Sequence, residues 1–240
     1  MMSYDRAANE RIAVTALQLL NSGTPTCGAD TAAPVAASLK WYRLDDGVMG
    51  GQSESDHIPL EDGKMLHFQG TINTHGGGFC SIRTKFYHTF LSTNAEAIKL
   101  VYRGDGKTYK LILSDGNRST GGPFGKSPSW QVDLPTQHLS ETQEWEERTL
   151  PLSSLLPNFG GRMSSRPPEE ERAHHKFNAE DMRELGIMLS LKLSNGQPNP
   201  VETFGSGIFP FSLMVKSIEV VHASSSSGGD VCEADKTSTT

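Results

Sequence analysis

The stretch Leu185-Gly-Ile-Met-Leu-Ser-Leu-Lys-Leu193 decides the fold, because leucine or isoleucine occupies every second position over nine residues. Successive side chains of a β-strand point to opposite faces, so this alternation is typical of a strand that buries one face. A helix would instead repeat its apolar residues every three or four positions. The segment is therefore predicted to be a half-buried strand.

The same period of two recurs on both sides of this stretch. Further alternating runs lie at Leu66–Phe68, Ile98–Tyr102, Tyr109–Leu113, Trp130–Leu134 and Phe209–Val215. The phase shifts between Val215 and Ile218, which predicts a β-bulge or kink. Many strands separated by Gly- and Pro-rich turns favour an all-β fold of two antiparallel sheets, a sandwich or jelly roll, over a parallel α/β fold.

Two local signals predict how elements begin and connect. Asn178 is a good helix N-cap residue, so a short helix is expected from there through Leu185. Asp105-Gly106 lies between two alternating runs, and Asp-Gly in that position predicts a β-hairpin. Arg103-Gly-Asp105 is also the tripeptide of extracellular adhesion proteins, an interpretation that a chain without a secretion signal disfavours.

The two ends differ in composition from the middle of the chain. Residues 1–38 are predicted to form a short amphipathic helix, with Ile12, Ala13, Leu17 and Leu20 on one stripe, followed by a small-residue linker. Residues 223–240 begin with a serine-glycine run and are predicted to be a disordered polar tail. The packed domain is expected at residues 39–222.

Composition excludes several classes of partner. The 240 residues carry a formal net charge of −6, which gives no electrostatic drive toward nucleic acid. Cys27, Cys80 and Cys232 have no CxxC spacing, so neither a disulfide framework nor a zinc site is expected. No apolar run approaches the ~20 residues of a membrane span, so an integral membrane protein is not expected.

Two glycine-rich segments could bind a ligand or only shape the backbone. Asp45-Asp-Gly-Val-Met-Gly-Gly-Gln-Ser53 could hold a hard cation through its carboxylates, but Asp and Gly also build turns, which we favour. The triplet at 76–78, before Phe79-Cys80, could cradle an anion, but it leads into a strand pattern rather than a helix. Cys80 itself is expected to be a buried structural thiol.

A catalytic site is not predicted. Glu146 and Glu147 are adjacent on a strand, so their carboxylates point to opposite faces and cannot share one site. Trp145 and Leu150, which flank this region, are interpreted as core residues. No hydrolase, metalloprotease, dinucleotide or phosphate-loop motif occurs, so no catalytic residue, metal or cofactor is assigned and an enzyme is not expected.

Taken in order, these segments resemble the complex I intermediate-associated protein 30 family. The resemblance spans roughly Trp41 to Val221. It is carried by these segments: Asp46–Ser53, Phe68–Gly70, Gly77–Arg83, Arg103–Gly106 with Tyr109, Trp145–Pro151, Phe159–Arg162, Leu185-Gly186 and Pro210–Leu213.

The resemblance implies a galactose-binding-domain-like jelly roll and a non-enzymatic, chaperone-like role. The expected partners are protein subunits in an assembly intermediate of complex I or a related membrane complex. The implied location is the matrix side of the mitochondrial inner membrane, with cytoplasm or plastid stroma as alternatives. The family offers no catalytic residues to transfer.

The partner-binding candidates lie within the quoted segments: Asp46, Met49, Ser53, Phe79, Arg83, Arg103, Asp105 and Arg162. Arginine and aromatic side chains are frequent anchors of protein interfaces. The alternative function is a carbohydrate-binding module with a sugar ligand, for which Trp130 and Tyr109 are the available platforms, although both also fit the core pattern.

Overall fold

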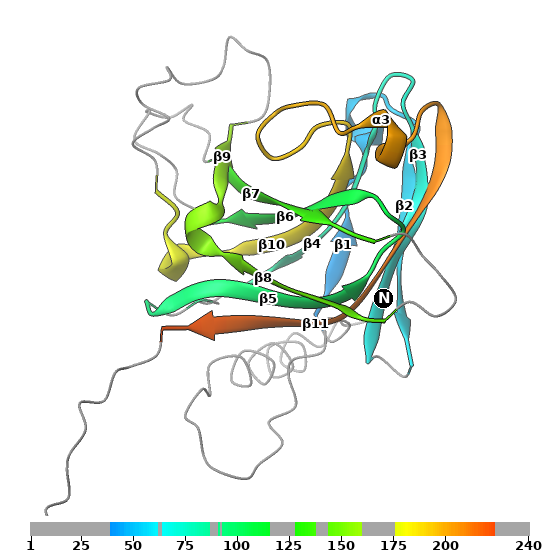
Figure 1. Ribbon diagram of the computed structural model, residues 1–240. Helices are drawn as coiled ribbons and strands as arrows, with labels where there is room; N and C mark the ends of the chain where they lie inside the picture. The colour runs from blue at the N-terminus through cyan, green and yellow to red at the C-terminus, as the bar shows by residue number, and fades with distance from the viewer. Residues whose placement is uncertain are drawn as a thin grey trace, which may run out of the picture.

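The computed structural model describes residues 39–61, 64–86, 91, 93–115, 128–137, 144–159 and 176–223. Within them the protein is an all-β sandwich of two antiparallel sheets with little helix (Figure 1). The strands are β1 (Trp41–Arg43), β2 (Glu54–Leu60), β3 (Met65–Asn73), β4 (Phe79–Lys85), β5 (Ala95–Arg103), β6 (Thr108–Ser114), β7 (Ser129–Pro135), β8 (Glu146–Pro151), β9 (Leu156–Asn158), β10 (Glu184–Ser190) and β11 (Ile208–His222). Short helical turns are η2 (Asp46–Met49), η4 (Leu152–Ser154), η6 (Ala179–Asp181) and α3 (Val201–Phe204).

The two sheets form two layers that face each other. One sheet has six strands in the order β1-β4-β10-β6-β7-β9, and the other has five in the order β2-β3-β11-β5-β8. The central strands are β10, which joins β4 to β6, and β11, which joins β3 to β5. The two-sheet antiparallel jelly roll predicted from the alternating runs is confirmed.

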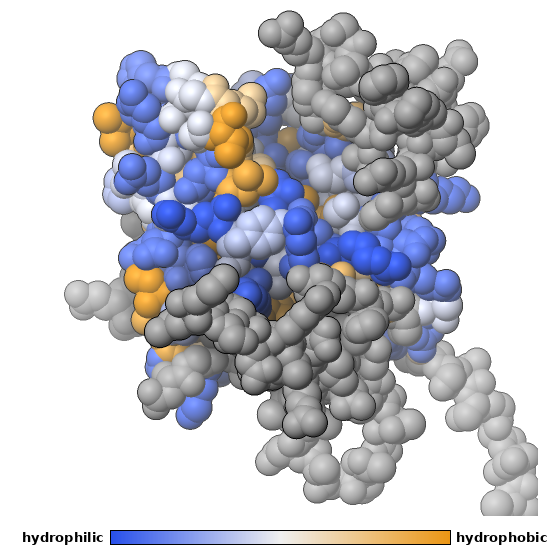
Figure 2. Space-filling view, turned by 180° about the vertical axis from the view of Figure 1, so that it is seen from behind, coloured by the Kyte–Doolittle hydropathy of each residue, from blue (hydrophilic) through white to orange (hydrophobic). Residues whose placement is uncertain are grey.

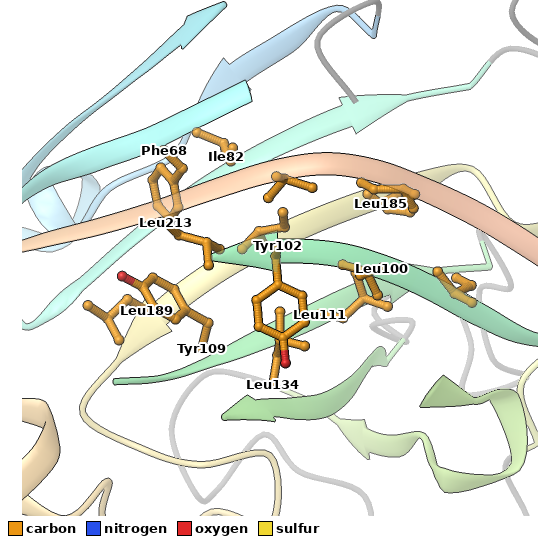
Figure 3. Packing of buried hydrophobic residues seen from close by; sticks show 14 of the residues in the cluster. Phe68, Ile82, Leu100, Tyr102, Tyr109, Leu111, Leu134, Leu185, Leu189 and Leu213 are labelled. Atoms are coloured by element: carbon orange, nitrogen blue, oxygen red, sulfur yellow. The ribbon is translucent and has the colours of Figure 1, made fainter. Parts of the chain in front are cut away.

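The core lies between the sheets, and the alternating residues fill it (Figure 3). Phe68 of β3 packs edge-on against Phe211 of β11, with ring centroids 4.9 Å apart. Tyr102 and Tyr109 enter the same layer from the two sheets and are almost completely buried. Burying such side chains is the main favourable contribution to the free energy of folding.

The predicted bulge in β11 is confirmed. The strand pairs with β5 at Met214 and Val215, and the register then shifts so that Ser217 lies opposite Val101. Lys216 is the extra residue, which explains why the apolar phase changes between Val215 and Ile218.

Three local expectations were wrong. The side chain of Asn178 does cap a turn by accepting from the Glu180 N–H at 3.2 Å, but this is the single 3₁₀ turn η6, and β10 begins at Glu184. The expected strand through Leu193 ends at Ser190, because the chain then turns back through a bridge between Lys192 and Pro198.

The third is the hairpin predicted at Asp105-Gly106. β5 and β6 belong to different sheets, so the connection crosses from one layer to the other. The predicted N-terminal helix and the polar tail lie outside the described residues. No helix in the described part of the chain combines the length and apolar character that a membrane crossing requires.

Candidate functional site

The carboxylate of Asp46 organises one end of the sandwich. Its Oδ1 accepts the Ser53 N–H at 2.9 Å, and its Oδ2 accepts the Ser53 hydroxyl at 2.6 Å. Oδ2 also accepts the backbone N–H groups of Gly78 and Phe79 from the next connection. Although burial alone would raise the pKa of Asp46, these donors hold it below its usual value.

The glycines of the two motifs are required because the chain passes close to this carboxylate. A Cβ on Gly51 or on Gly77 would collide with the Asp46 side chain. Asp45 has a parallel role one residue earlier, since its oxygens accept from the Ser55 hydroxyl at 2.7 Å and the Ser81 N–H at 3.3 Å. The turn interpretation of the Asp-Asp segment therefore describes what these carboxylates do.

Around this carboxylate, three connections meet at what we call the loop end: residues 44–53, 74–78 and 191–207, together with Ile208 at the start of β11. The β10–β11 connection is tied to the others by hydrogen bonds, one of which runs from the Thr74 N–H to the Gly207 carbonyl at 2.9 Å. The Leu191 N–H donates to the Gly78 carbonyl at 3.0 Å, and the Gly207 N–H donates to the Thr74 hydroxyl at 3.1 Å.

The loop end exposes apolar side chains. Val48 is 68% exposed and Met49 is 77% exposed on the turn η2. Leu191, Val201 and Ile208 are exposed on the same end, and among large apolar residues of the described segments only Leu156 is exposed elsewhere. Figure 2 shows hydrophobic residues, in orange, at the upper left, the end that carries these connections, and a second group at the lower left.

Charge is sparse on this surface. Residues 47–53 and 74–79 contain no Asp, Glu, Lys or Arg, and the Asp46 carboxylate that holds them together is completely buried. The connection at 191–207 adds two exposed charges, Lys192 and Glu202. The part of the loop end formed by residues 47–53 and 74–78 is thus uncharged, and hydrogen bonds hold it in shape. A surface that is already ordered loses little conformational entropy when a partner covers it.

The structure brings four of the predicted partner residues together here. Asp46 and Ser53 are buried and hold the loop end in shape, whereas Met49 is exposed on it. Phe79 follows as the first residue of β4 and is half-buried. The sequence named these residues as partner-binding candidates without predicting that they would adjoin one another, and it could not separate the buried ones from the exposed one.

The other predicted residues lie elsewhere. Arg83 is on β4, where it forms an ion pair with Glu184 at 2.8 Å, and the Tyr42 hydroxyl donates to the same carboxylate at 2.6 Å. Arg103 and Asp105 lie at and just after the end of β5. Arg162 lies outside the described residues.

Asp105 fixes the crossover between the sheets. Its Oδ1 accepts the Tyr109 hydroxyl and its Oδ2 accepts the Ser212 N–H, both at 3.0 Å. Lys107 lies 3.3 Å from Oδ2. Because both oxygens are engaged within the protein, the adhesion interpretation of Arg103-Gly-Asp105 has no available carboxylate to support it.

Sequence reasoning missed an open groove of ≈ 1030 Å³ on the five-stranded sheet. It is lined by short runs of consecutive residues on the neighbouring strands β2, β3 and β11, and only strand order shows that these runs adjoin one another. Its lining includes Arg43, Asp56, Gln69, Asp105, Lys107 and Ser212.

The sugar platforms named from the sequence are not on the surface. Tyr109 and Trp130 are in the core, at 0% and 3% exposed. Cys80 is also buried, and burial raises the pKa of its thiol, as expected of a structural cysteine. The described residues contain no group of three His, Cys, Asp or Glu side chains that could hold a metal ion.

Fold and site together define a β-sandwich whose sequence motifs build one rigid, glycine-rich end. The family model for complex I intermediate-associated protein 30 (CIA30) matches residues 31–215, which is most of the chain. The chain belongs to this family.

Solved structures with a similar fold are distant in sequence. The family 11 carbohydrate-binding module of the cellulosomal cellulase Lic26A-Cel5E of Clostridium thermocellum is 12% identical with a TM-score of 0.47, covering 83% of this chain and 97% of that one. The agarase AgWH50C is 6% identical with a TM-score of 0.44, covering 76% of this chain and 24% of that one. No curated protein matched the sequence.

Proposed function

We propose that this protein is a non-enzymatic, chaperone-like assembly factor that binds protein subunits of complex I, or of a related membrane complex, before assembly is finished. The proposed location is the matrix side of the mitochondrial inner membrane. Membership of the complex I intermediate-associated protein 30 family supports this role. The proposed contact surface is the loop end.

The observation that carries the proposal is the exposure of Val48 and Met49 on a turn that is locked by the buried Asp46. Large apolar side chains on a monomer are usually covered when they gather in one place. Fully burying such a side chain contributes about 1.5–3 kcal/mol, so two of them could supply much of a specific interface.

Disruption of the gene tests the function itself. We expect reduced accumulation of the mature membrane complex, with normal amounts of the subunit transcripts and enrichment of a smaller intermediate, as seen on native gels. The protein should co-purify with subunits of that intermediate. Normal complex levels together with saturable binding to a glycan array would overturn the proposal in favour of a sugar-binding module.

A double variant tests the surface. Val48→Ser with Met49→Ser should fold normally, because both side chains point into solvent, yet should retain at most about one-hundredth of the affinity for the intermediate. Leu156→Ser is the matched control, since Leu156 is an exposed apolar residue on β9, away from the loop end. Equal capture of the intermediate by the double variant and the wild type would exclude the loop end as the contact surface.

A further inference from the structure

A second surface lies on the outer side of the five-stranded sheet, where two cations contact one indole ring. The Arg103 guanidinium carbon is 4.5 Å from the centre of the Trp145 ring, and the Lys216 ammonium is 5.7 Å from it. Trp145 immediately precedes β8, and β8 pairs with β5, so Trp145 lies beside Arg103. Trp145 is thus not the core residue that the sequence predicted.

The bulge in β11 accounts for the third member of this cluster. Lys216 is the residue that β5 leaves unpaired, between Val215 opposite Tyr102 and Ser217 opposite Val101. Bulges commonly change the direction of a side chain next to a functional site. Here the bulge places a second positive charge on the same ring as Arg103.

Among the described residues, neither cation has a carboxylate partner. Two other basic residues of this face are paired with carboxylates: Lys99 lies 2.9 Å from Glu147, and Lys107 lies 3.3 Å from Asp105. Arg148 on β8 is in no ion pair of the described segments, and Arg43 donates to the Ser55 carbonyl. Arg103 and Lys216 take part in none of the ion pairs formed within the described segments. The Nε of Arg103 is shielded from solvent and has no hydrogen-bond partner there.

This cluster adjoins the groove. Arg103 is opposite Met214 on β11, and Ser212, two residues earlier on the same strand, lines the groove. The groove continues across β3 to Glu54 and Asp56 on the edge strand β2. The face therefore has Arg103 and Lys216 at one side and the Asp105–Lys107 ion pair with neutral polar residues in the middle. Glu54 and Asp56 lie at the far edge together with Arg43.

We propose that Arg103, Trp145 and Lys216 bind the carboxylate of an acidic polypeptide segment that continues into the groove. The guanidinium of Arg103 and the ammonium of Lys216 can both donate hydrogen bonds to carboxylate oxygens. The contact with the Trp145 ring holds the guanidinium in position before the ligand binds. The groove spans strands β11, β3 and β2, and the two carboxylates at its far edge, which exceed the single cation Arg43 there, favour a basic residue further along the segment. This inference rests on the proposed function in one respect, which is that the ligand is a polypeptide.

The test is a titration of the full chain in low salt with acetylated hexaglutamate, followed through the Trp145 indole N–H signal in a ¹H–¹⁵N spectrum. Trp145→Phe assigns that signal, and Trp41 and Trp130, which are buried, serve as internal references. We expect a saturable shift of the Trp145 signal alone. Arg103→Gln with Lys216→Gln should weaken binding at least tenfold, and the single variant Arg103→Lys should weaken it less.

Lys99→Gln is the matched control, because Lys99 is a cation of the same sheet that already has a carboxylate partner, and it should leave the affinity unchanged. The inference is overturned if the signal does not move, if hexalysine moves it equally, or if the double variant binds as the wild type does. Inorganic phosphate binding as tightly as hexaglutamate would also overturn it, by showing a site for a small anion. The Val48 and Met49 variant should bind hexaglutamate as tightly as the wild type does. The proposal for the loop end and the proposal for this site can therefore fail independently, and the two failures are distinguishable.

Discussion

A buried carboxylate gives the loop end its shape. Asp46 accepts four hydrogen bonds, two from Ser53 and two from the backbone of Gly78 and Phe79. These donors come from segments more than twenty residues apart in the chain. The negative charge is stable there because it is fully hydrogen-bonded, whereas an unpaired buried charge would be expensive.

Asp46→Asn tests this role. Asparagine keeps one acceptor oxygen but directs an NH₂ group at donors, so we expect the free energy of unfolding at pH 7 to fall by about 3 kcal/mol. The pKa of Asp46 is lowered in the folded state, so its contribution is present above the unfolded value of 3.8 and is lost as pH falls through the folded pKa.

Urea unfolding across pH 3–7 measures both effects. The gap between wild type and Asp46→Asn should narrow toward the acid end. A constant gap, or one below about 0.5 kcal/mol at pH 7, would contradict the role given to this carboxylate.

For individual residues, the sequence indicated which segments matter better than it indicated the role of each side chain. The Asp46–Ser53 and Gly77–Arg83 motifs were singled out, and they do meet. Whether a side chain within them is buried depends on which backbone donors reach it from another segment. Local pattern does not contain that information, which is why buried Asp46 and exposed Met49 were grouped together.

Among the elements, β11 has the largest role in the pairing of the five-stranded sheet. Its first half pairs with β3 and its second half with β5, with the bulge at Lys216 between them. Gly70 lies on β3 between β2 and β11, and a Cβ there would collide with the Glu54 carbonyl of β2 and with the Phe211 ring of β11.

Gly70→Ala should therefore lower the free energy of unfolding by about 2–3 kcal/mol, because backbone atoms of β2 would have to move. Gly47→Ala is the control, since a Cβ there would meet nothing within 4 Å and its backbone does not need a positive φ. Thermal unfolding of both variants compares them. A smaller loss for Gly70→Ala than for Gly47→Ala would show that this close approach does not constrain the sheet.

Strands were easier to predict than their connections. Period-two alternation identified β3, β5, β6, β7, β10 and β11 because burial of one face leaves a local trace. The connection at Asp105-Gly106 was mistaken for a hairpin because its turn residues fit one. Partners distant in sequence decide the outcome: Asp105 is held by Ser212, 107 residues later, and the chain crosses between layers.

For the whole molecule, the predicted limits of the packed domain can be tested directly. The sandwich uses strands from Trp41 to His222, and both central strands come from its last third. A chain reduced to residues 39–222 should keep one cooperative unfolding transition, with a midpoint within about 2 °C of the full chain. A fall of more than about 5 °C would show that the removed ends contribute to packing.

Strand order also constrains when this protein can fold during its synthesis. Neither sheet can close until β10 and β11 have left the ribosome, since β10 connects β4 with β6 and β11 connects β3 with β5. Until then the nascent chain holds two incomplete halves of each sheet with open edges. Contacts so distant in sequence form slowly. The nascent chain thus passes through an unfinished state in which its newly made strands are open to mispairing with other chains.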